Sequence, residues 1–247
     1  MPQLRISLIL PAVTALMAAA AACGSSPAVE PTPATSPAPT PTPTPVNVEA
    51  LIQQSGEAMA ALKTFRFFLS HPSGGTPLAL LPGLAIQEAE GAVINPDGLE
   101  ARFSGALGAL YVESNLISVG DDSYLTNPLT GKWEAIPQEI SPLAFFNPRD
   151  GIASMMSQVS EVTLTSESAD EYRVAGRIPA EALAPLLGKT LSGVSVSVEL
   201  IIDRQSHHLR EARFEGRVTS GEPDGTIRVI TLSGFDEPLS IEPPAMP

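Results

Sequence analysis

The sequence predicts an α+β domain, in which a long antiparallel meander of strands is accompanied by a few helices. Two observations predict this class. Apolar residues recur at helical spacing at the start of the folded part, over residues 48–62. From residue 65 onward, apolar and polar residues alternate, and runs of glycine, proline and asparagine divide the chain into short segments. Residues 46–247 are enough for one sizeable core, so we expect one domain there.

The first element of this domain is an amphipathic helix. Its apolar side chains fall three or four residues apart, and its charged and amide side chains fall on the other face. Asn47 stands before the first apolar residue and can cap the helix with its side-chain oxygen. The positions of the apolar face are Val48, Leu51, Ile52, Ser55, Met59 and Leu62.

Strands follow, and the clearest is 194–203, where every second residue is apolar. Residues 209–219 alternate in the same way, and the polar connection 204–208 predicts a hairpin between the two. Two further helices are expected between strands, over 148–159 and 179–187. The candidate strands are 65–70, 86–94, 100–104, 111–119, 123–126, 133–135, 162–166, 171–178, 194–203, 209–219 and 226–235.

The N-terminal 45 residues are expected to lie outside this domain. Residues 1–22 have a basic start, a short apolar centre and a small-residue end, which together predict an export signal rather than a membrane span. Cys23, the single cysteine of the chain, follows Ala20-Ala21-Ala22, as in a lipoprotein signal, and we expect it to be acylated. The alternative is an ordinary secretory signal cleaved near Ala22, which would leave a free thiol.

Residues 23–45 predict a disordered tether that carries the acylated cysteine. Proline alternates there with threonine, alanine and serine, a composition that buries little and favours the extended polyproline II conformation. The tether is therefore expected to act as a spacer between a membrane and the folded domain.

The composition also argues against several functions. The chain carries 27 acidic and 14 basic residues, a formal net charge of −13, so nucleic-acid binding is not expected. His207 and His208 fall in a predicted hairpin turn, and His71 begins a loop without an evident partner. No serine-hydrolase elbow, calcium loop or phosphate loop occurs. We therefore expect no catalytic residue, metal site or cofactor.

Several fragments, taken in order after a lipoprotein signal, carry a family resemblance. The most specific one runs from Gly120 through Asp121-Asp122-Ser123-Tyr124 to Gly131-Lys132-Trp133. The others are Pro82-Gly83-Leu84, Glu90-Gly91, Asn95-Pro96-Asp97, Phe146-Asn147-Pro148, Arg177-Ile178-Pro179, Val196 to Asp203, Leu209-Arg210 and Leu232 to Phe235. The sequence resembles the LppX/LprAFG family of bacterial cell-envelope lipoproteins, whose fold is related to the LolA/LolB lipoprotein carriers.

The resemblance implies a curved sheet, a half-barrel, whose concave face is covered by helices around an apolar cavity for acylated lipids or lipoglycans. We expect the strands at 194–203 and 209–219 to line it. Residues 71–85 are interpreted as a mobile rim or short helix at its mouth, although their leucines could equally fill the core. The candidate lining residues are Val194, Val196, Val198, Leu200, Phe214, Leu80 and Leu84.

The expected function is that of a lipid carrier held at the extracytoplasmic face of the cell membrane by its acylated N-terminus. A membrane exporter or another envelope protein is a possible partner. The alternative is a non-carrier accessory lipoprotein of the same fold, which would bind a protein partner with its cavity collapsed.

Overall fold

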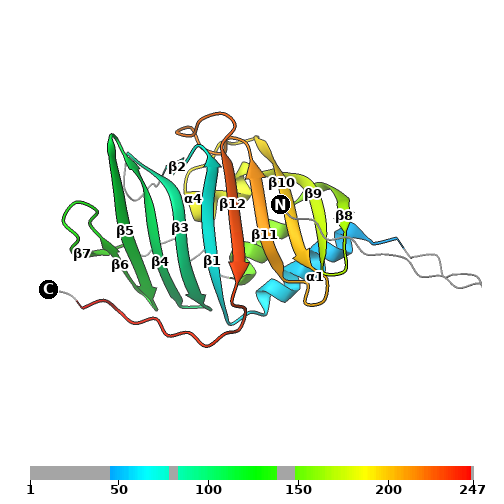
Figure 1. Cartoon of the computed structure of the whole chain (residues 1–247), viewed down its shortest axis with the longest axis horizontal. Helices are drawn as coiled ribbons and strands as arrows, with labels where there is room; N and C mark the ends of the chain where they lie inside the picture. Colours follow the sequence, from blue (N-terminus) through cyan, green and yellow to red (C-terminus); the bar gives the residue numbers. More distant parts are fainter. Residues whose placement is uncertain (1–44, 78–82, 138–147, 246–247) are drawn as a thin grey trace, which may run out of the picture. The chain divides into compact units, whose positions relative to one another are not determined.

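The computed structural model of the protein describes residues 45–77, 83–137 and 148–245, all within one compact unit that begins at Thr44. These residues form an open, antiparallel sheet with helices on one side (Figure 1). Leu80 and the other predicted rim residues at 78–82 lie outside the described residues, as do the signal, Cys23 and the tether up to residue 44.

The sheet has β1 and β12 at its centre, although these strands come first and last along the chain. From β1 the strands run outward to one edge, and from β8 they run inward to β12, so that each half is a meander of antiparallel neighbours. The order across the sheet is β7-β6-β5-β4-β3-β1-β12-β11-β10-β9-β8, with β2 paired to β3. The pairing of Phe67 with Leu232 joins the two halves.

Alternation of side chains gives this sheet one apolar face, as the sequence predicts. The strands are β1 (Thr64–Ser73), β2 (Thr76–Pro77), β3 (Leu84–Ile94), β4 (Gly98–Leu107), β5 (Leu110–Val119), β6 (Asp122–Thr126), β7 (Trp133–Ile136), β8 (Ser160–Glu167), β9 (Glu171–Pro179), β10 (Ser195–Asp203), β11 (Leu209–Glu215) and β12 (Ile227–Ser233). All of the predicted strands are present, with ends that differ by a few residues.

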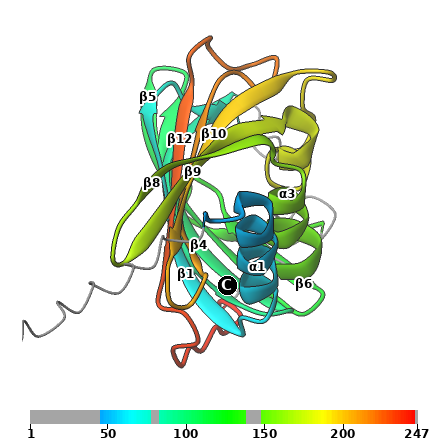
Figure 2. The same cartoon turned by 90° about the vertical axis from the view of Figure 1, so that its right-hand side faces the viewer.

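The helices lie on the concave side of the sheet (Figure 2). The predicted first helix is α1 (Val48–Ala60), and Asn47 caps it by accepting a hydrogen bond from the Ala50 N–H at 2.9 Å. The other two predicted helices each consist of two short pieces. They are η2 (Pro148–Ala153) with α3 (Ser154–Ser157), and η3 (Ala180–Leu183) with α4 (Ala184–Leu187).

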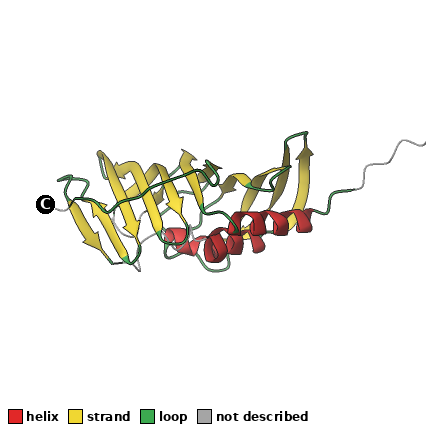
Figure 3. Ribbon diagram, turned by 90° about the horizontal axis from the view of Figure 1, so that it is seen from below, coloured by secondary structure: helices red, strands yellow, loops and turns green. Residues whose placement is uncertain are grey.

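These helices cover the two halves of the sheet unequally (Figure 3). The α1 helix contacts η2 and α3, and together they pack against the side of the sheet that holds β8 to β11. We call β8 to β11 with this helical cover the packed half, and β1 to β5 the hollow half. Strand β12 lies between the two.

Two of the predicted segments are corrected. A short helix within 71–85 is wrong for the described residues, because β1 continues to Ser73, a turn at Gly74 (φ +78°) leads into β2, and Leu84 already begins β3. The strand predicted over 209–219 ends at Glu215. It ends there because the Glu222 carboxylate accepts the N–H groups of Val218 and Thr219, at 2.8 and 3.1 Å, and these donors are lost to the sheet.

Candidate functional site: an apolar cavity in the hollow half

An apolar cavity of about 80 Å³ lies inside the hollow half, between the concave face of the sheet and α4. Thr76 supplies the one polar side chain among the described residues that line it. The full lining comprises Phe67, Leu69, Thr76, Pro77, Ile86, Ala89, Leu99, Ala101, Phe103, Leu116, Leu186, Leu187 and Ile230. Such a lining can hold a hydrocarbon group by dispersion and exclusion of water, and it offers no chemistry for catalysis.

Small inward-facing residues in two adjacent strands make room for this cavity. Strand β3 places Ala89 and Gly91 on the concave face, and β4 places Ala101 and Gly105 there. Of these residues, Ala89 and Ala101 line the cavity. The space beside Gly91 is filled, because a Cβ there would lie 2.2 Å from the Glu100 carbonyl oxygen and 2.7 Å from the Phe67 ring. A larger residue at Gly91 would therefore displace the backbone of β4 or the Phe67 ring.

The cavity has a short helical cover. Leu186 and Leu187 of α4 form the wall opposite the sheet, and Leu187 is 7% exposed. The helix is only four residues long and ends at Gly188, whose φ of +78° is one that larger residues rarely adopt. Few backbone hydrogen bonds hold such a helix, so its packing on the cavity is what keeps it in place.

Between β10, β11 and the helices above them, the packed half has almost no such space. Val196, Val198 and Leu200 of β10 are buried on its concave face, each no more than 3% exposed. Their neighbour Phe214 in β11 borders a residual cavity of about 10 Å³ together with Ile152, Met155, Leu209, Ala212, Ile230 and Leu232. These side chains pack against the helical cover, as in the interior of a folded core.

Of the residues predicted to line the cavity, none described is part of its wall. Val196, Val198 and Leu200 lie in the packed half, Val194 is half-buried just before β10, and Leu84 is buried at the start of β3. The wall residues that sequence reasoning missed lie in β1, β3, β4 and α4. Their signal in the sequence is the small residues at alternate positions of two neighbouring strands.

A buried polar network lies at the end of the cavity formed by β2. Arg228 of β12 and Glu222 form an ion pair whose side chains are 2% and 0% exposed. Arg228 Nε donates to Thr76 Oγ1 at 2.9 Å, and Thr76 Oγ1 also lies 2.7 Å from His71 Nε2. The other ring nitrogen of His71 lies 3.0 Å from the carbonyl oxygen of Gln87.

His71 therefore has two partners, contrary to the prediction that it begins a loop without one. Burial lowers the pKa of His71 below its ordinary value of 6.5, and the nearby Arg228 charge lowers it further. The Gln87 carbonyl and the Glu222 carboxylate act in the opposite direction. The net effect favours the neutral imidazole.

The other two histidines lie in the turn between β10 and β11, as predicted. The His208 ring contacts the Phe235 ring, with centroids 4.6 Å apart and planes tilted by 51°, and His207 adopts a φ of +57° in the turn. Across residues 45–77, 83–137 and 148–245, no group of three or more potential ligands is arranged to hold a metal ion. None of the helices within these ranges combines the length and apolar character of a membrane span.

A second hollow, an open groove of about 560 Å³, lies between α1, α3 and β8. Glu49, Gln53 and Glu57 form one of its walls, whereas Met156, Val159 and Val162 lie on the other. This groove is more open than the cavity of the hollow half, and two carboxylates line it, whereas none of the described lining residues of the cavity is charged.

The fold and the cavity together define a half-barrel protein with an internal apolar site. The family model of the LppX_LprAFG lipoproteins matches residues 47–241, so the chain belongs to this family. The predicted family and the predicted half-barrel are confirmed. This is a family of lipoproteins rather than of enzymes.

Solved structures show the same fold. LprF from Mycobacterium bovis is 18% identical, with a TM-score of 0.62 over 80% of this chain and 96% of LprF. LppX from Mycobacterium tuberculosis is 20% identical, with a TM-score of 0.55 over 79% of this chain and 98% of LppX. A LolA superfamily protein from Nitrosomonas europaea also matches, at 11% identity and a TM-score of 0.27 over 77% of this chain and 93% of that protein. No curated protein matches the chain by sequence.

Proposed function

We propose that this protein binds the acyl chains of lipids or lipoglycans in the cavity of the hollow half, and carries them within the cell envelope. The observation that carries the proposal is the continuous wall of apolar side chains, in which Thr76 is the one polar side chain among the described lining residues. Membership of a lipoprotein family supports it.

The energetics of acyl transfer suit a carrier without catalytic groups. Burial of a CH₂ group gains about 0.8 kcal/mol over water, so a 16-carbon chain gains roughly 12 kcal/mol. A bilayer offers nearly the same gain, so exchange between membrane and protein is close to neutral. The protein then only has to lower the cost of moving the chain across water.

The size of the cavity requires a conformational change on lipid uptake. A cavity of about 150 Å³ holds a benzene molecule, whereas the cavity here has about 80 Å³. A long acyl chain therefore needs the walls to separate. We assign this movement to α4, because Leu186 and Leu187 form the cover and few hydrogen bonds hold so short a helix.

We further propose that residues 1–22 are an export signal, that Cys23 is acylated, and that residues 23–45 tether the domain (residues 46–247) to the outer face of the cell membrane. Two or three acyl chains give a stable anchor, whereas one chain gives only marginal binding. A net charge of −13 gives the chain no general attraction to anionic lipid.

Lipid binding is tested by native mass spectrometry of the purified protein and by uptake of a fluorescent fatty acid after delipidation. We expect adducts with the masses of acylated lipids, and saturable uptake of the probe. A protein that arrives without lipid and takes up no probe would contradict the carrier proposal and favour the non-carrier accessory role.

The anchor is tested separately with Cys23→Ser in the full-length chain, expressed in a bacterium that processes lipoproteins. The variant should be exported but recovered in the soluble fraction, because it cannot be acylated. Wild-type protein is the control and should stay with membranes after a high-salt wash. Retention of Cys23→Ser in washed membranes would show that something other than this cysteine holds the protein there.

A further inference from the structure

With a neutral His71, the polar network at the end of the cavity has one arrangement of protons. The Gln87 carbonyl oxygen can only accept, so the proton of the neutral ring lies on Nδ1, and Nε2 is the acceptor. The Thr76 hydroxyl donates to Nε2, and its oxygen accepts from Arg228 Nε.

Protonation of His71 breaks this arrangement. A proton on Nε2 turns the acceptor of the Thr76 hydroxyl into a donor. Thr76 Oγ1 can accept from both His71 Nε2 and Arg228 Nε, but its own proton then loses the His71 nitrogen as its acceptor. It also adds a positive charge beside a network that already contains Arg228. The charged groups that act on His71 are Arg228 of β12 and Glu222 of the loop between β11 and β12, and they form an ion pair with each other.

The same network connects a loop to β2, whose two residues border the cavity. We call residues 216–226, between β11 and β12, the strap; it lies beside the ends of β1 and β2 (Figure 1). It packs closely on the chain beneath, since a Cβ at Gly221 would lie 3.0 Å from Pro77 and one at Gly74 would lie 2.6 Å from Thr226 Oγ1. Thr76 and Pro77 form β2 and line the cavity.

The strap also has hydrogen bonds outside this network, since the Leu191 N–H donates to the Val218 carbonyl oxygen and the Arg217 side chain donates to the Thr219 and Ser220 carbonyls. Strand β2 pairs with β3 at only two positions, Thr76 with Ile86 and Pro77 with Ala85. Glu222 lies within the strap, accepts hydrogen bonds from the backbone N–H groups of two other strap residues, and forms the ion pair with Arg228. Thr76 thus connects β2 both to the strap, through Arg228, and to β1, through His71.

We propose that His71 is an acid-sensitive latch: its neutral form holds β2 and the strap over the end of the cavity, and its protonation loosens them and speeds the release of bound lipid. The part of this proposal that concerns lipid release rests on the proposed function. The loosening of the strap does not, and it is tested without a ligand.

The direction of the pH effect follows from the His71 pKa, which is lowered in the folded, latched state. The latch is fully closed above about pH 6.5, the ordinary value for histidine, and it is lost as the pH falls through the lower pKa of the latched state. A single proton changes the opening equilibrium by at most about tenfold per pH unit in this window.

Hydrogen exchange of the delipidated full-length protein tests the latch between about pH 7.5 and 5, with rates corrected for intrinsic exchange. We expect residues 216–222 and Thr76 to lose protection by up to about tenfold per pH unit below pH 6.5. His71→Gln places a neutral amide beside Thr76 and should remove this pH dependence. Thr76→Val should expose the strap at both pH values.

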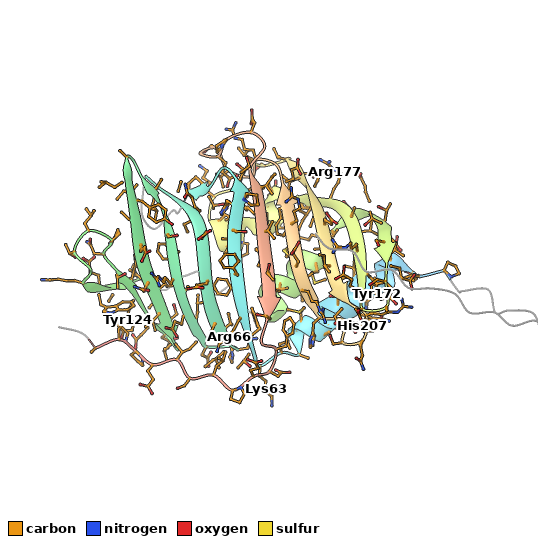
Figure 4. All side chains as sticks on the ribbon, viewed as in Figure 1. Lys63, Arg66, Tyr124, Tyr172, Arg177 and His207 are labelled. Carbon is orange, nitrogen blue, oxygen red and sulfur yellow. The ribbon has the colours of Figure 1, made fainter. Side chains whose placement is uncertain are left out.

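His208→Gln is the matched control. The pKa of His208 is also lowered by burial, but this residue lies in the turn at the far end of β11, next to His207 (Figure 4). Its substitution should leave the pH dependence of the strap intact. Strap exchange that does not change with pH in the wild type, or changes equally in His71→Gln, would overturn the latch.

The lipid arm measures dissociation of a fluorescent fatty acid at the same pH values. Dissociation should quicken with acid in the wild type and not in His71→Gln. Probe binding with acid-sensitive exchange but a constant dissociation rate would overturn the release role alone. A failure of the wild type to bind the probe would overturn the proposed function, while exchange would still decide the latch.

Discussion

The two halves of the sheet have the same alternation of inward and outward side chains, but one half forms a packed core and the other forms the wall of a cavity. In the packed half, β10 presents Val196, Val198, Leu200 and Ile202 to the concave face, where they share one buried core with side chains of α1, η2 and α3. In the hollow half, β3 and β4 present alanine and glycine at several of the equivalent inward positions, and a cavity of about 80 Å³ remains. Side-chain volume and helical cover, rather than alternation, distinguish a core from a cavity wall.

The ion pairs of the structure also differ in how deeply they are buried. The Arg228–Glu222 pair is almost fully buried beside the end of the cavity. The charged pairs of the packed half lie nearer to water, as does Arg173 with Glu171 at 2.8 Å, whose side chains are 41% and 27% exposed. The buried pair therefore lies on β12 and the strap, at the end of the cavity, where breaking it should cost more than breaking an exposed pair.

The largest effect is expected from Arg228→Met, which leaves the Glu222 carboxylate buried without its cation. Loss of one partner of a buried pair costs about 3–5 kcal/mol, and the midpoint of urea unfolding should fall accordingly. Glu222→Gln added to this variant should restore part of the loss, because the amide oxygen can still accept from the strap backbone. An unchanged urea midpoint for Arg228→Met would show that the pair does not hold the strap.

A second prediction compares one substitution in the two halves. Ala212→Phe places a ring where only about 10 Å³ is free, and overpacking of this kind costs about 1–3 kcal/mol. Ala101→Phe places the same ring in the larger cavity, so its cost should be smaller, and it should compete with lipid. Urea unfolding and fatty-acid uptake measure the two effects. Equal losses of stability would mean that the halves are packed alike.

A smaller effect is expected from Asn47→Ala at the start of α1. The variant removes the acceptor of the Ala50 N–H, and loss of such a cap costs typically about 1 kcal/mol. Because α1 covers the packed half, the variant should lower the urea midpoint without changing the affinity for the fatty-acid probe. A large loss of affinity would place the lipid against α1 instead.

The sequence predicts the elements well and the cavity poorly, for a physical reason. Helical spacing over 48–62 and alternation in 194–203 are local patterns, and both elements form where predicted. Alternation shows that Val198 faces inward, but not whether a helix or empty space lies opposite. That depends on which strands α1, η2 and α3 cover, and α1 reaches its place through contacts with η2, α3, β8 and β11, all of which lie far along the chain from it.

The contacts of the strap also could not be predicted from local sequence patterns. Nothing local indicates that Thr76, Glu222 and Arg228 meet, since about 150 residues separate the first from the other two. The pairing of β1 with β12 brings them together, because it joins the beginning of the domain to its end. His71 therefore lacks an evident partner in the sequence but has two in the fold.

The position of a bound acyl chain tests most directly the claim that the hollow half is the binding site. A crystal structure of the protein with a fatty acid brominated along its chain would locate the bromine by anomalous scattering. We predict bromine between β3, β4 and α4, beside Ala101 and Leu187, with α4 displaced from the sheet. Bromine between β9 to β11 and α1, beside Val198 and Phe214, would contradict the assignment and return the site to the packed half.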